Sequence, residues 1–358
     1  MTSGPTNELP LVSIVVNNFN YERFLRQSID SALDQDHPRT EVVVVDDCST
    51  DGSRALIQGY GDRIVPVLQE ENGGQGAAMN VGFDAASGDV VIFLDADDYL
   101  YPQAASAVAA AYRDDAAVIQ YRLHLVDEEG AVLDLYPRPE LRFDQGDVRQ
   151  KLLTTGRFEG TVTSGQAFGR KALAAALPMP ADRFRISADG YLLSTVPFHG
   201  QVIAIEEPHG AYRLHGNNLW SAVQNRAAGF RRSLEHDADK LREVRAQAES
   251  ASLEIESDPE LRDYQHLSAR LGSLLFDRSQ HPYPKDRRLG LALRGWSAAR
   301  RSSFGGMPRL MLGIWFLGTG LLPGGMARSF YRWRFESDAR PKILRRTAST
   351  LRRVLGKK

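Results

Sequence analysis

The sequence contains a single cysteine among its 358 residues, and its N-terminus lacks a basic segment followed by an apolar one. One cysteine, Cys48, excludes an internal disulfide and a cysteine-rich metal site, which fits a reducing compartment. Without the basic and apolar segments of a secretory signal peptide, we expect a cytoplasmic protein. The composition is 42% hydrophobic and 25% charged, which excludes a wholly disordered chain.

The charge of the chain is unevenly distributed. The 44 Lys and Arg residues and 45 Asp and Glu residues give a net charge of −1. From Arg328 to Lys358, however, eleven basic residues accompany two acids, so this tail carries +9 and residues 1–327 carry −10. A mildly acidic body with a basic tail predicts an anionic surface that only the tail touches.

Short apolar runs alternate with helical patterns in the first hundred residues. The runs are rich in β-branched residues and predict buried strands at residues 11–16, 41–45, 64–68 and 89–94. Helical apolar spacing covers 21–35, and a run of small residues covers 74–86. Strands that alternate with helices predict right-handed βαβ units, and therefore an α/β fold with a mostly parallel sheet flanked by helices.

Polar residues follow three of these strands: Asn17-Asn18, Asp46-Asp47 and Asp95-Ala96-Asp97-Asp98. Ligands of parallel sheets bind at the carboxyl ends of the strands, so these groups are expected to be neighbours. On an extended segment Asp95 and Asp97 point to one side and Asp98 points away. Hard carboxylate oxygens suit Mg²⁺ or Mn²⁺, which also binds phosphate oxygens.

The alternative for this aspartate cluster is a polar loop that caps the next helix. Acids gathered at one edge of a sheet disfavour that alternative, because carboxylates repel one another unless a cation or a donor-rich ligand lies among them.

Three motifs mark the ends of these strands: SIVVNNFNY, VVVVDDCSTDGS and ENGGQGAAMNVGFDAASGDVVIFLDADD. In order, spacing and strand context, they resemble the nucleotide-sugar-binding half of family 2 glycosyltransferases, which have the Rossmann-like GT-A fold. The close resemblance covers Val12 to Asp98, and a looser one extends to about residue 220. It implies transfer of a sugar from a nucleotide-diphosphate sugar, with a UDP-sugar favoured.

The resemblance also implies roles for single residues in the donor site. Asn18 and Asn20 would edge the nucleotide pocket, and Asp47 would accept a hydrogen bond from the base. Asp95 would face the ribose and a Mn²⁺ or Mg²⁺ ion, and Asp97 would be the main ligand of that ion. The segment that shapes the sugar-diphosphate pocket would contain Asn72, Gly74 and Asn80.

Two positions depart from the family pattern. The family usually has proline where Asn17 stands and a basic residue where Met79 stands. The diphosphate contact expected from that basic side chain is therefore in doubt, whereas the metal-binding aspartates are unaffected.

Asp189, in the segment RISADGYLLSTV, resembles the acid of the family's Glu-Asp pair, with Ala188 in the place of the Glu. A carboxylate beside the sugar carbon can take the proton of the acceptor hydroxyl as a general base. The alternative is an ordinary acid at a helix N-terminus. Loss of the Glu removes a common acceptor contact.

Two further segments resemble the acceptor half of the family. In SGQAFGRKAL, Gly165 and Gln166 would line the acceptor pocket. In AYRLHGNNLW, His215 would complete the metal shell or bind diphosphate, and Trp220 would stack on a sugar ring. A lone histidine is more often a surface or packing residue, so the role of His215 stays open.

The chain changes character after residue 222. Residues 223–304 read as α-helical and can pack on the catalytic domain or form a homo-oligomer contact, and the sequence does not decide between these. Leu310 to Ala327 is eighteen residues without a charge, which is borderline against the roughly 20 that a spanning helix needs.

The apolar segment and the basic, aromatic tail that follows it suit a membrane interface. The alternative is a buried core helix followed by a disordered basic tail. Nucleic-acid binding is a rival use of a basic tail, but it fits poorly beside a transferase-like domain and an apolar segment, so we expect no nucleic-acid partner.

We therefore expect three regions: 1–222 as the GT-A catalytic domain, 223–304 as the helical region and 305–358 as a membrane-associating tail. No Gln-x-x-Arg-Trp segment occurs, which indicates single addition rather than processive synthesis. The leading hypothesis is a metal-dependent inverting glycosyltransferase that uses a cell-envelope or lipid-linked glycan acceptor at the cytoplasmic face of the membrane. The alternatives are a nucleotidyltransferase and a non-catalytic scaffold with a degenerate transferase domain.

Overall fold

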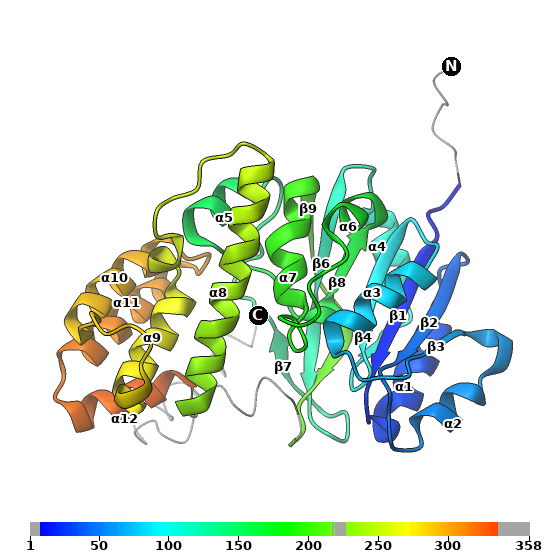
Figure 1. Cartoon of the computed structure of the whole chain (residues 1–358), viewed down its shortest axis with the longest axis horizontal. Coiled ribbons are helices and arrows are strands. Elements are labelled where there is room, and N and C mark those ends of the chain that lie inside the picture. The colour runs from blue at the N-terminus through cyan, green and yellow to red at the C-terminus, as the bar shows by residue number, and fades with distance from the viewer. Residues whose placement is uncertain (1–7, 217, 219–226, 336–358) are drawn as a thin grey trace, which may run out of the picture. The chain divides into compact units, whose positions relative to one another are not determined.

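The computed structural model describes residues 8–216, 218 and 227–335 of the chain (Figure 1). The chain divides into two compact units: 1–220 with 239–255, and 221–238 with 256–358. The long helix α8 (Ala227–Ser250) contributes residues to both units.

The first unit is built on one mixed sheet. Its strands lie in the order β3-β2-β1-β4-β8-β6-β9-β5, and β7 pairs with β6. The strands are β1 (Val12–Asn18), β2 (Thr40–Asp46), β3 (Val65–Leu68), β4 (Val90–Asp95), β5 (Tyr99–Leu100), β6 (Ala116–Val126), β7 (Val132–Tyr136), β8 (Gln166–Gly169) and β9 (Gln201–Arg213). The strands β3, β2, β1 and β4 are parallel, as predicted, whereas β8 runs antiparallel to both β4 and β6. The α/β fold class is thus confirmed.

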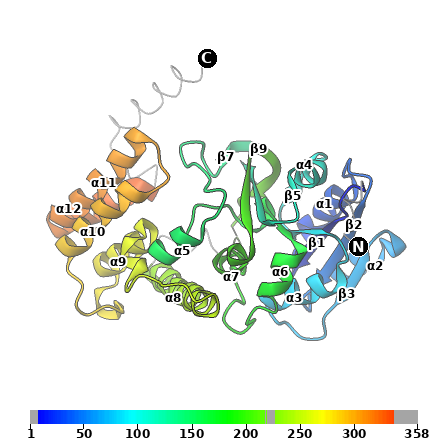
Figure 2. The same cartoon turned by 90° about the horizontal axis from the view of Figure 1, so that it is seen from above.

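Helices cover both faces of this sheet (Figure 2). The helices are α1 (Glu22–Leu33), α2 (Ser53–Gln58), α3 (Gln75–Ala85), α4 (Ala104–Ala111), α5 (Arg149–Thr155), α6 (Arg170–Ala176) and α7 (Asp189–Thr195). Side chains of a strand alternate between the two faces. Ile14 and Val16 of β1 therefore pack in the core that contains α1 and α4, and Val15 packs in the core that contains α3 and α6.

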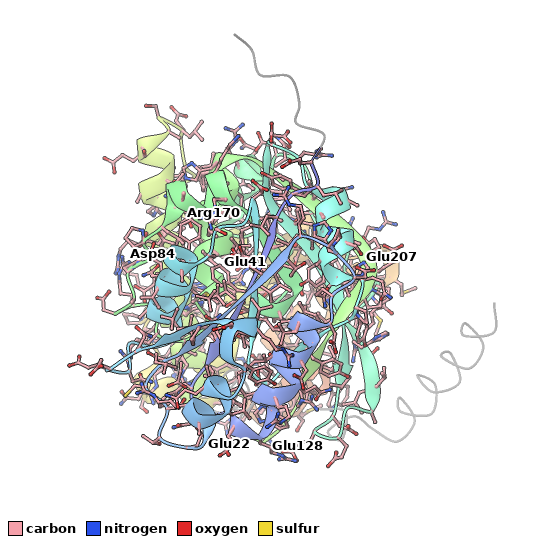
Figure 3. The ribbon with its side chains drawn as sticks, turned by 90° about the vertical axis from the view of Figure 1, so that its right-hand side faces the viewer. Glu22, Glu41, Asp84, Glu128, Arg170 and Glu207 are labelled. Carbon is pink, nitrogen blue, oxygen red and sulfur yellow. The ribbon has the colours of Figure 1, made fainter. Side chains whose placement is uncertain are left out.

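The starts and the ends of the parallel strands have different surroundings. Glu41, near the start of β2, accepts hydrogen bonds from Ser13, Ser87 and Gly88, which joins the starts of three strands. Figure 3 shows Glu41 and Arg170 toward one end of the sheet and Glu22 toward the other. The carboxyl ends of β1, β2 and β4 lie at the end away from Glu41, and polar loops follow them there.

In the described part of the second unit, four α-helices follow α8: α9 (Tyr264–Phe276), α10 (Arg288–Arg301), α11 (Gly306–Leu321) and α12 (Gly324–Phe335). Their core includes Leu267, Leu271, Phe316 and Tyr331. The uncharged segment 310–327 is thus not one element, because α11 ends before Pro323 and α12 begins after it. In the described part of the chain, no helix is long and apolar enough to cross a membrane.

Candidate active site

The polar residues that follow β1, β2 and β4 meet at one edge of the sheet. Asn17 is the register partner of Asp95, and Asn18 is the partner of Asp46. Asn18 Nδ2 donates to Asp46 Oδ1 at 2.8 Å. The structure therefore brings these three groups together, as the strand order predicted.

The last two residues of β1 carry buried amide atoms that lack a protein partner. Both side-chain amide atoms of Asn17 and the Oδ1 atom of Asn18 are buried, with no hydrogen-bond partner in the described part of the chain. A buried polar atom left unsatisfied costs about 1–3 kcal/mol. A ligand or an ordered water commonly satisfies such atoms, which makes this edge a candidate binding site. Sequence reasoning placed Asn17 at the ligand-binding edge of the sheet and as a departure from a family pattern, but it did not show that the amide atoms lack a protein partner.

Asp47 organises the loop that precedes α3. Its carboxylate accepts hydrogen bonds from the main-chain N–H groups of Gly73 and Gly74 at 2.8 and 2.7 Å and from the Gln69 side chain at 2.8 Å. Burial raises the pKa of Asp47, while the two glycine N–H groups oppose that rise. Gly74 has a φ of +84°, and a Cβ atom there would lie 2.8 Å from Arg185. Only glycine fits this turn without strain.

The predicted asparagines at this site are engaged in loop contacts. Asn20 has a φ of 58°, and its Oδ1 accepts from Thr50 N at 2.7 Å. Asn72 Nδ2 donates to the carbonyl oxygen of Asp47 at 3.0 Å. The Asn80 amide bonds both main-chain polar groups of Met179, at 2.9 and 3.0 Å. These contacts place Asn72 and Asn80 as supports of the loops around the site.

The segment Asp95 to Asp98 is a turn, not the extended segment assumed from the sequence. Asp98 N donates to the carbonyl oxygen of Asp95 at 3.0 Å, which closes the turn. The Asp98 side chain is buried and accepts hydrogen bonds from Ser164 Oγ at 2.6 Å and from Arg213 N at 2.8 Å. The extended geometry assumed for these residues was therefore wrong, and the Asp98 side chain contacts residues distant in sequence.

The carboxylates of this turn repel one another. Burial, and then the charges of Asp97 and Asp189, raise the pKa of Asp95 to about 8. Burial, and then the charges of Asp97 and Asp95, raise the pKa of Asp98 well above its usual range. A site that holds several close carboxylates favours a ligand that brings positive charge.

His215 lies next to Asp97. Its Nε2 atom is 2.9 Å from Asp97 Oδ2, and its ring contacts Phe24 with centroids 5.2 Å apart. Asn218 Nδ2 is 3.4 Å from the same carboxylate oxygen, and Asn218 Oδ1 accepts from His215 N. Sequence reasoning did not identify Asn218.

The donor set at this edge suits a divalent cation, but the described residues do not form a closed metal site. No group of three or more His, Cys, Asp or Glu side chains in the described part of the chain is arranged to hold a metal. The oxygens of Asp95 and Asp97 and the mutual repulsion of the carboxylates fit a hard cation that takes further ligands from phosphate.

Gln75, the first residue of α3, connects the aspartate turn to α7. Its Nε2 donates to Asp95 Oδ1 at 2.8 Å, and its Oε1 accepts from Ala188 N at 3.0 Å. Asp189 follows Ala188 at the start of α7 and is close enough to influence the Asp95 pKa. Gln75 therefore links Asp95 to the start of α7, where Asp189 lies, although the two acids are far apart in sequence.

We predict that Gln75→Leu lowers kcat/KM for sugar transfer by about 10- to 100-fold, the usual range for residues that orient catalytic groups. Leucine has a similar size but makes neither hydrogen bond, so Asp95 and the start of α7 lose their link. Steady-state kinetics, with thermal unfolding as a check on folding, would measure this. The same substitution at the exposed Gln58 is the control, and equal activity of the two variants would contradict the prediction.

The predicted acceptor residues lie in different surroundings. Gly165 and Gln166 are both buried, and Gln166 Nε2 donates to the carbonyl oxygen of Thr161. Trp220 lies outside the described residues. The acceptor roles of all three residues stay predictions.

Arg213, at the end of β9, is a residue of this site that sequence reasoning missed. Its buried guanidinium donates to the carbonyl oxygen of Asp97 at 2.9 Å and to Gln27 Oε1 at 2.6 Å. Its own main-chain N–H binds Asp98. Arg213 thus holds the aspartate turn through both Asp97 and Asp98. The sequence analysis assigned a role only to His215, which lies two residues later in the same motif.

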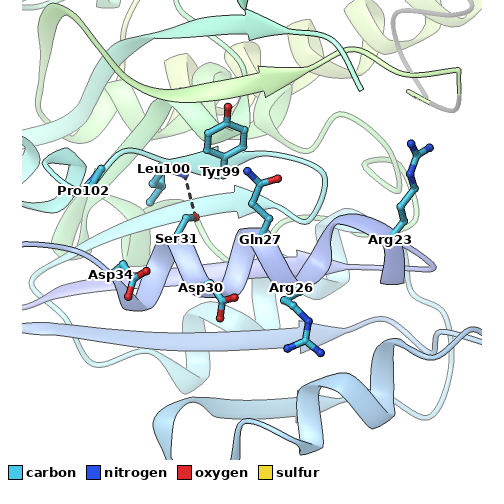
Figure 4. Close-up of a pocket in the computed structure, with 9 residues that line it drawn as sticks. All are labelled: Arg23, Arg26, Gln27, Asp30, Ser31, Asp34, Tyr99, Leu100 and Pro102. Atoms are coloured by element: carbon cyan, nitrogen blue, oxygen red, sulfur yellow. Dashed lines mark hydrogen bonds between the residues drawn. The ribbon is translucent and has the colours of Figure 1, made fainter. Parts of the chain in front are cut away.

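A separate pocket lies between α1 and the segment Tyr99–Pro102 (Figure 4). Leu100 N donates to Ser31 Oγ at 3.1 Å within it. Its lining includes none of the predicted site residues, so we do not assign it to the donor.

A parallel half-sheet whose strands end in asparagines and clustered aspartates defines an α/β nucleotide-binding fold of the GT-A type. Comparison with known proteins agrees. The model of the family described as glycosyl transferase family 2 matches residues 13–174. An uncharacterized glycosyltransferase from Nostoc sp. is 35% identical over 219 residues, which are 59% of this chain and 67% of that protein.

Two other similar proteins cover different shares of the chain. A putative teichuronic acid biosynthesis glycosyltransferase from Bacillus subtilis is 44% identical over 96 residues, 26% of this chain and 38% of that protein. A mannosyltransferase from Pyrobaculum calidifontis, solved with GDP-Man and Mn²⁺, is 17% identical, with a TM-score of 0.52 over 98% of this chain and 89% of its own. The latter shares the fold. The chain belongs to glycosyl transferase family 2 and is a glycosyltransferase.

Proposed function

We propose that the protein is a metal-dependent, inverting glycosyltransferase that moves one sugar from a nucleotide-diphosphate sugar to a hydroxyl of a cell-envelope or lipid-linked glycan. The observation that carries the proposal is the link through Gln75 between Asp95, in the aspartate turn with Asp97, and the start of α7 with Asp189, beside the unpartnered amide atoms of Asn17 and Asn18. A donor needs polar contacts and charge compensation there, and an acceptor needs a base.

The donor is proposed to be a nucleotide-diphosphate sugar, with a UDP-sugar favoured by the motif resemblance. The unpartnered amide atoms of Asn17 and Asn18 can bind the hydroxyl and phosphate groups of such a donor. Asp47 keeps its predicted role as an acceptor for the base. The GDP-Man bound to the structural relative supports a nucleotide sugar as the class of donor.

The metal is proposed to be Mn²⁺ or Mg²⁺, held by Asp95 and Asp97, with His215 next to Asp97. When bound, the ion supplies positive charge that stabilises the departing diphosphate. The Mn²⁺ in the structural relative supports this choice of metals. Gln75 and Arg213 hold the two aspartates in place through Asp95 Oδ1 and the Asp97 carbonyl oxygen.

Asp189 is proposed as the general base. Its carboxylate takes the proton of the acceptor hydroxyl while the hydroxyl oxygen forms a bond to the anomeric carbon. The bond from that carbon to the diphosphate oxygen breaks in the same displacement, and the electron pair leaves with the nucleoside diphosphate. A single displacement inverts the anomeric centre, so no second carboxylate nucleophile is needed.

The acceptor is proposed from a relative and from a missing motif, and the location from the C-terminal part of the chain. The teichuronic acid relative supports a cell-envelope acceptor, and the absence of a Gln-x-x-Arg-Trp segment supports single addition. We propose that residues 1–222 form the catalytic domain, 223–304 a helical region that also offers a surface for homo-oligomer formation, and 305–358 the part that associates with the cytoplasmic face of the membrane.

The test is turnover of a panel of nucleotide-diphosphate sugars by the full-length protein, with and without Mn²⁺. We expect hydrolysis or transfer from one donor, several-fold or more faster with the metal. Thermal shift with nucleoside diphosphates and metal would identify the base, because a bound ligand stabilises the folded state. Turnover of no donor, with no stabilisation by any nucleotide, would contradict the proposal.

A further inference from the structure

Helix α11 of the second unit has apolar side chains on two opposite faces. One face carries Leu312, Trp315 and Phe316, which are buried in the core of that unit. The other carries Met307, Leu310, Met311, Ile314 and Leu321, which are 67%, 47%, 62%, 50% and 66% exposed. At 100° per residue, these five side chains form a stripe about 100° wide. A helix that is apolar all round is normally buried on every side.

We call these five side chains the α11 stripe. A row of large apolar side chains exposed together marks a site of interaction with a protein or a membrane. The only charged side chain on α11, Arg309, lies away from the stripe in helical projection, and its guanidinium donates to the carbonyl oxygen of Phe304 at 2.8 Å. No charge therefore interrupts the stripe.

The charges of the surrounding sequence all have one sign. Between Arg287 and Phe335 the sequence contains nine arginines and no aspartate or glutamate. Arg288 donates to the carbonyl oxygen of Gly320 at 3.0 Å, and among the described residues no carboxylate pairs with it. Arg294 and Arg300 of α10 are exposed. An apolar stripe within an all-basic region is complementary to apolar lipid chains beneath anionic headgroups.

The length of α11 determines how such a helix would lie. Its 16 residues extend about 24 Å, which is shorter than the roughly 30 Å hydrocarbon core of a bilayer. Its other face is already packed against protein. The helix would therefore lie in the plane of the interface, with only the stripe among the acyl chains.

We propose that the α11 stripe is a docking surface for an anionic lipid bilayer, with the arginines of α10 and α12 contacting the headgroups. This proposal rests on the membrane association proposed above and assigns it to a defined helix face. It differs from the expectation that the basic tail alone touches the membrane. A protein partner would instead be expected to present acids opposite these arginines.

The test uses the full-length protein and vesicles of phosphatidylcholine, with or without phosphatidylglycerol. The variant Leu310→Gln/Met311→Gln/Ile314→Gln removes most of the apolar stripe at exposed positions. We expect its partition onto phosphatidylglycerol vesicles in a sedimentation assay to fall by about tenfold or more. The matched control is Val132→Gln/Leu133→Gln on β7, where both side chains are also exposed, at 60% and 55%, and where we expect no change.

A second variant tests the charge component without altering the stripe. Arg294→Gln/Arg300→Gln should weaken binding to phosphatidylglycerol vesicles by about 30-fold, since each basic residue near an anionic surface contributes about 1 kcal/mol and two are removed. High salt should reduce wild-type binding, because it screens exposed charges. Circular dichroism melts would show that each variant folds.

Three results would overturn the proposal. Both variants could bind phosphatidylglycerol vesicles as strongly as the wild type does, or the wild type could fail to bind these vesicles. The third result is that the triple variant loses self-association but keeps lipid binding. The last result would assign the stripe to a second copy of the chain. Donor hydrolysis by the same proteins distinguishes failure of the docking proposal from failure of the proposed enzymatic function, because none of the substituted residues lies in the donor site.

Discussion

Asp189→Asn is expected to lower the rate of sugar transfer by about 100- to 10,000-fold, the range that general base catalysis contributes. Asparagine has nearly the same shape but cannot accept the proton of the acceptor hydroxyl. Donor binding should stay close to that of the wild type, because Asp189 is not among the residues proposed to contact the nucleotide or metal. Transfer kinetics and calorimetric titration of nucleoside diphosphate would measure the two effects separately.

The pH profile provides an independent check on Asp189. Burial raises its pKa above the ordinary carboxyl value. A base acts in its deprotonated form, so transfer should fall as the pH is lowered through this raised pKa. The Asp189→Asn variant should not show this fall of the transfer rate at low pH. Asp182→Asn, at an exposed position nearby in the sequence, is the control. Full transfer activity in Asp189→Asn would refute the base assignment.

Asp97→Asn is expected to lower transfer by about 100-fold or more and, unlike Asp189→Asn, to weaken metal-dependent binding of the nucleotide. The substitution removes the negative charge proposed to hold the ion, and with it the contribution of the ion to diphosphate binding. Titration of nucleoside diphosphate with and without Mn²⁺ would measure this. The Kd of the variant should lose most of its dependence on metal.

The control for Asp97 is Asp114→Asn, which changes an exposed carboxylate outside the proposed site. It should leave both transfer and metal-dependent binding unchanged. If Asp97→Asn bound nucleotide with an unaltered response to Mn²⁺, Asp97 would not be a metal ligand. Together, Asp97→Asn and Asp189→Asn thus separate metal binding from general base catalysis, which a loss of activity alone would not distinguish.

The donor half of the fold could be read from local patterns. The β-branched runs that became β1, β2 and β4 bury both faces of a parallel sheet, so they are apolar throughout and easy to locate. Because strands of a parallel sheet end at one edge, the proximity of Asn18, Asp46 and Asp95 also followed. Neither β8 nor its antiparallel course followed, since the four residues QAFG are too short and too mixed to show a strand pattern.

The C-terminal half shows what local patterns leave open. The uncharged segment 310–327 suggested an interfacial helix, but composition alone does not tell which face of a helix finds a protein partner. The structure packs Trp315 and Phe316 inside and leaves Met311 and Ile314 outside. This division depends on α9, α10 and α12, which meet α11 only in the folded unit.

The sequence by itself determined the family resemblance, the order of the βαβ elements and the acids at their ends, because these depend on residues close together in the chain. Only the tertiary structure decided how those acids are held. Gln75 reaches Ala188, and Arg213 reaches the Asp97–Asp98 turn, across more than 100 residues. Such contacts form only when the sheet has assembled. They could not be predicted from the sequence, because hydrogen bonds between distant residues carry no periodic signal in it.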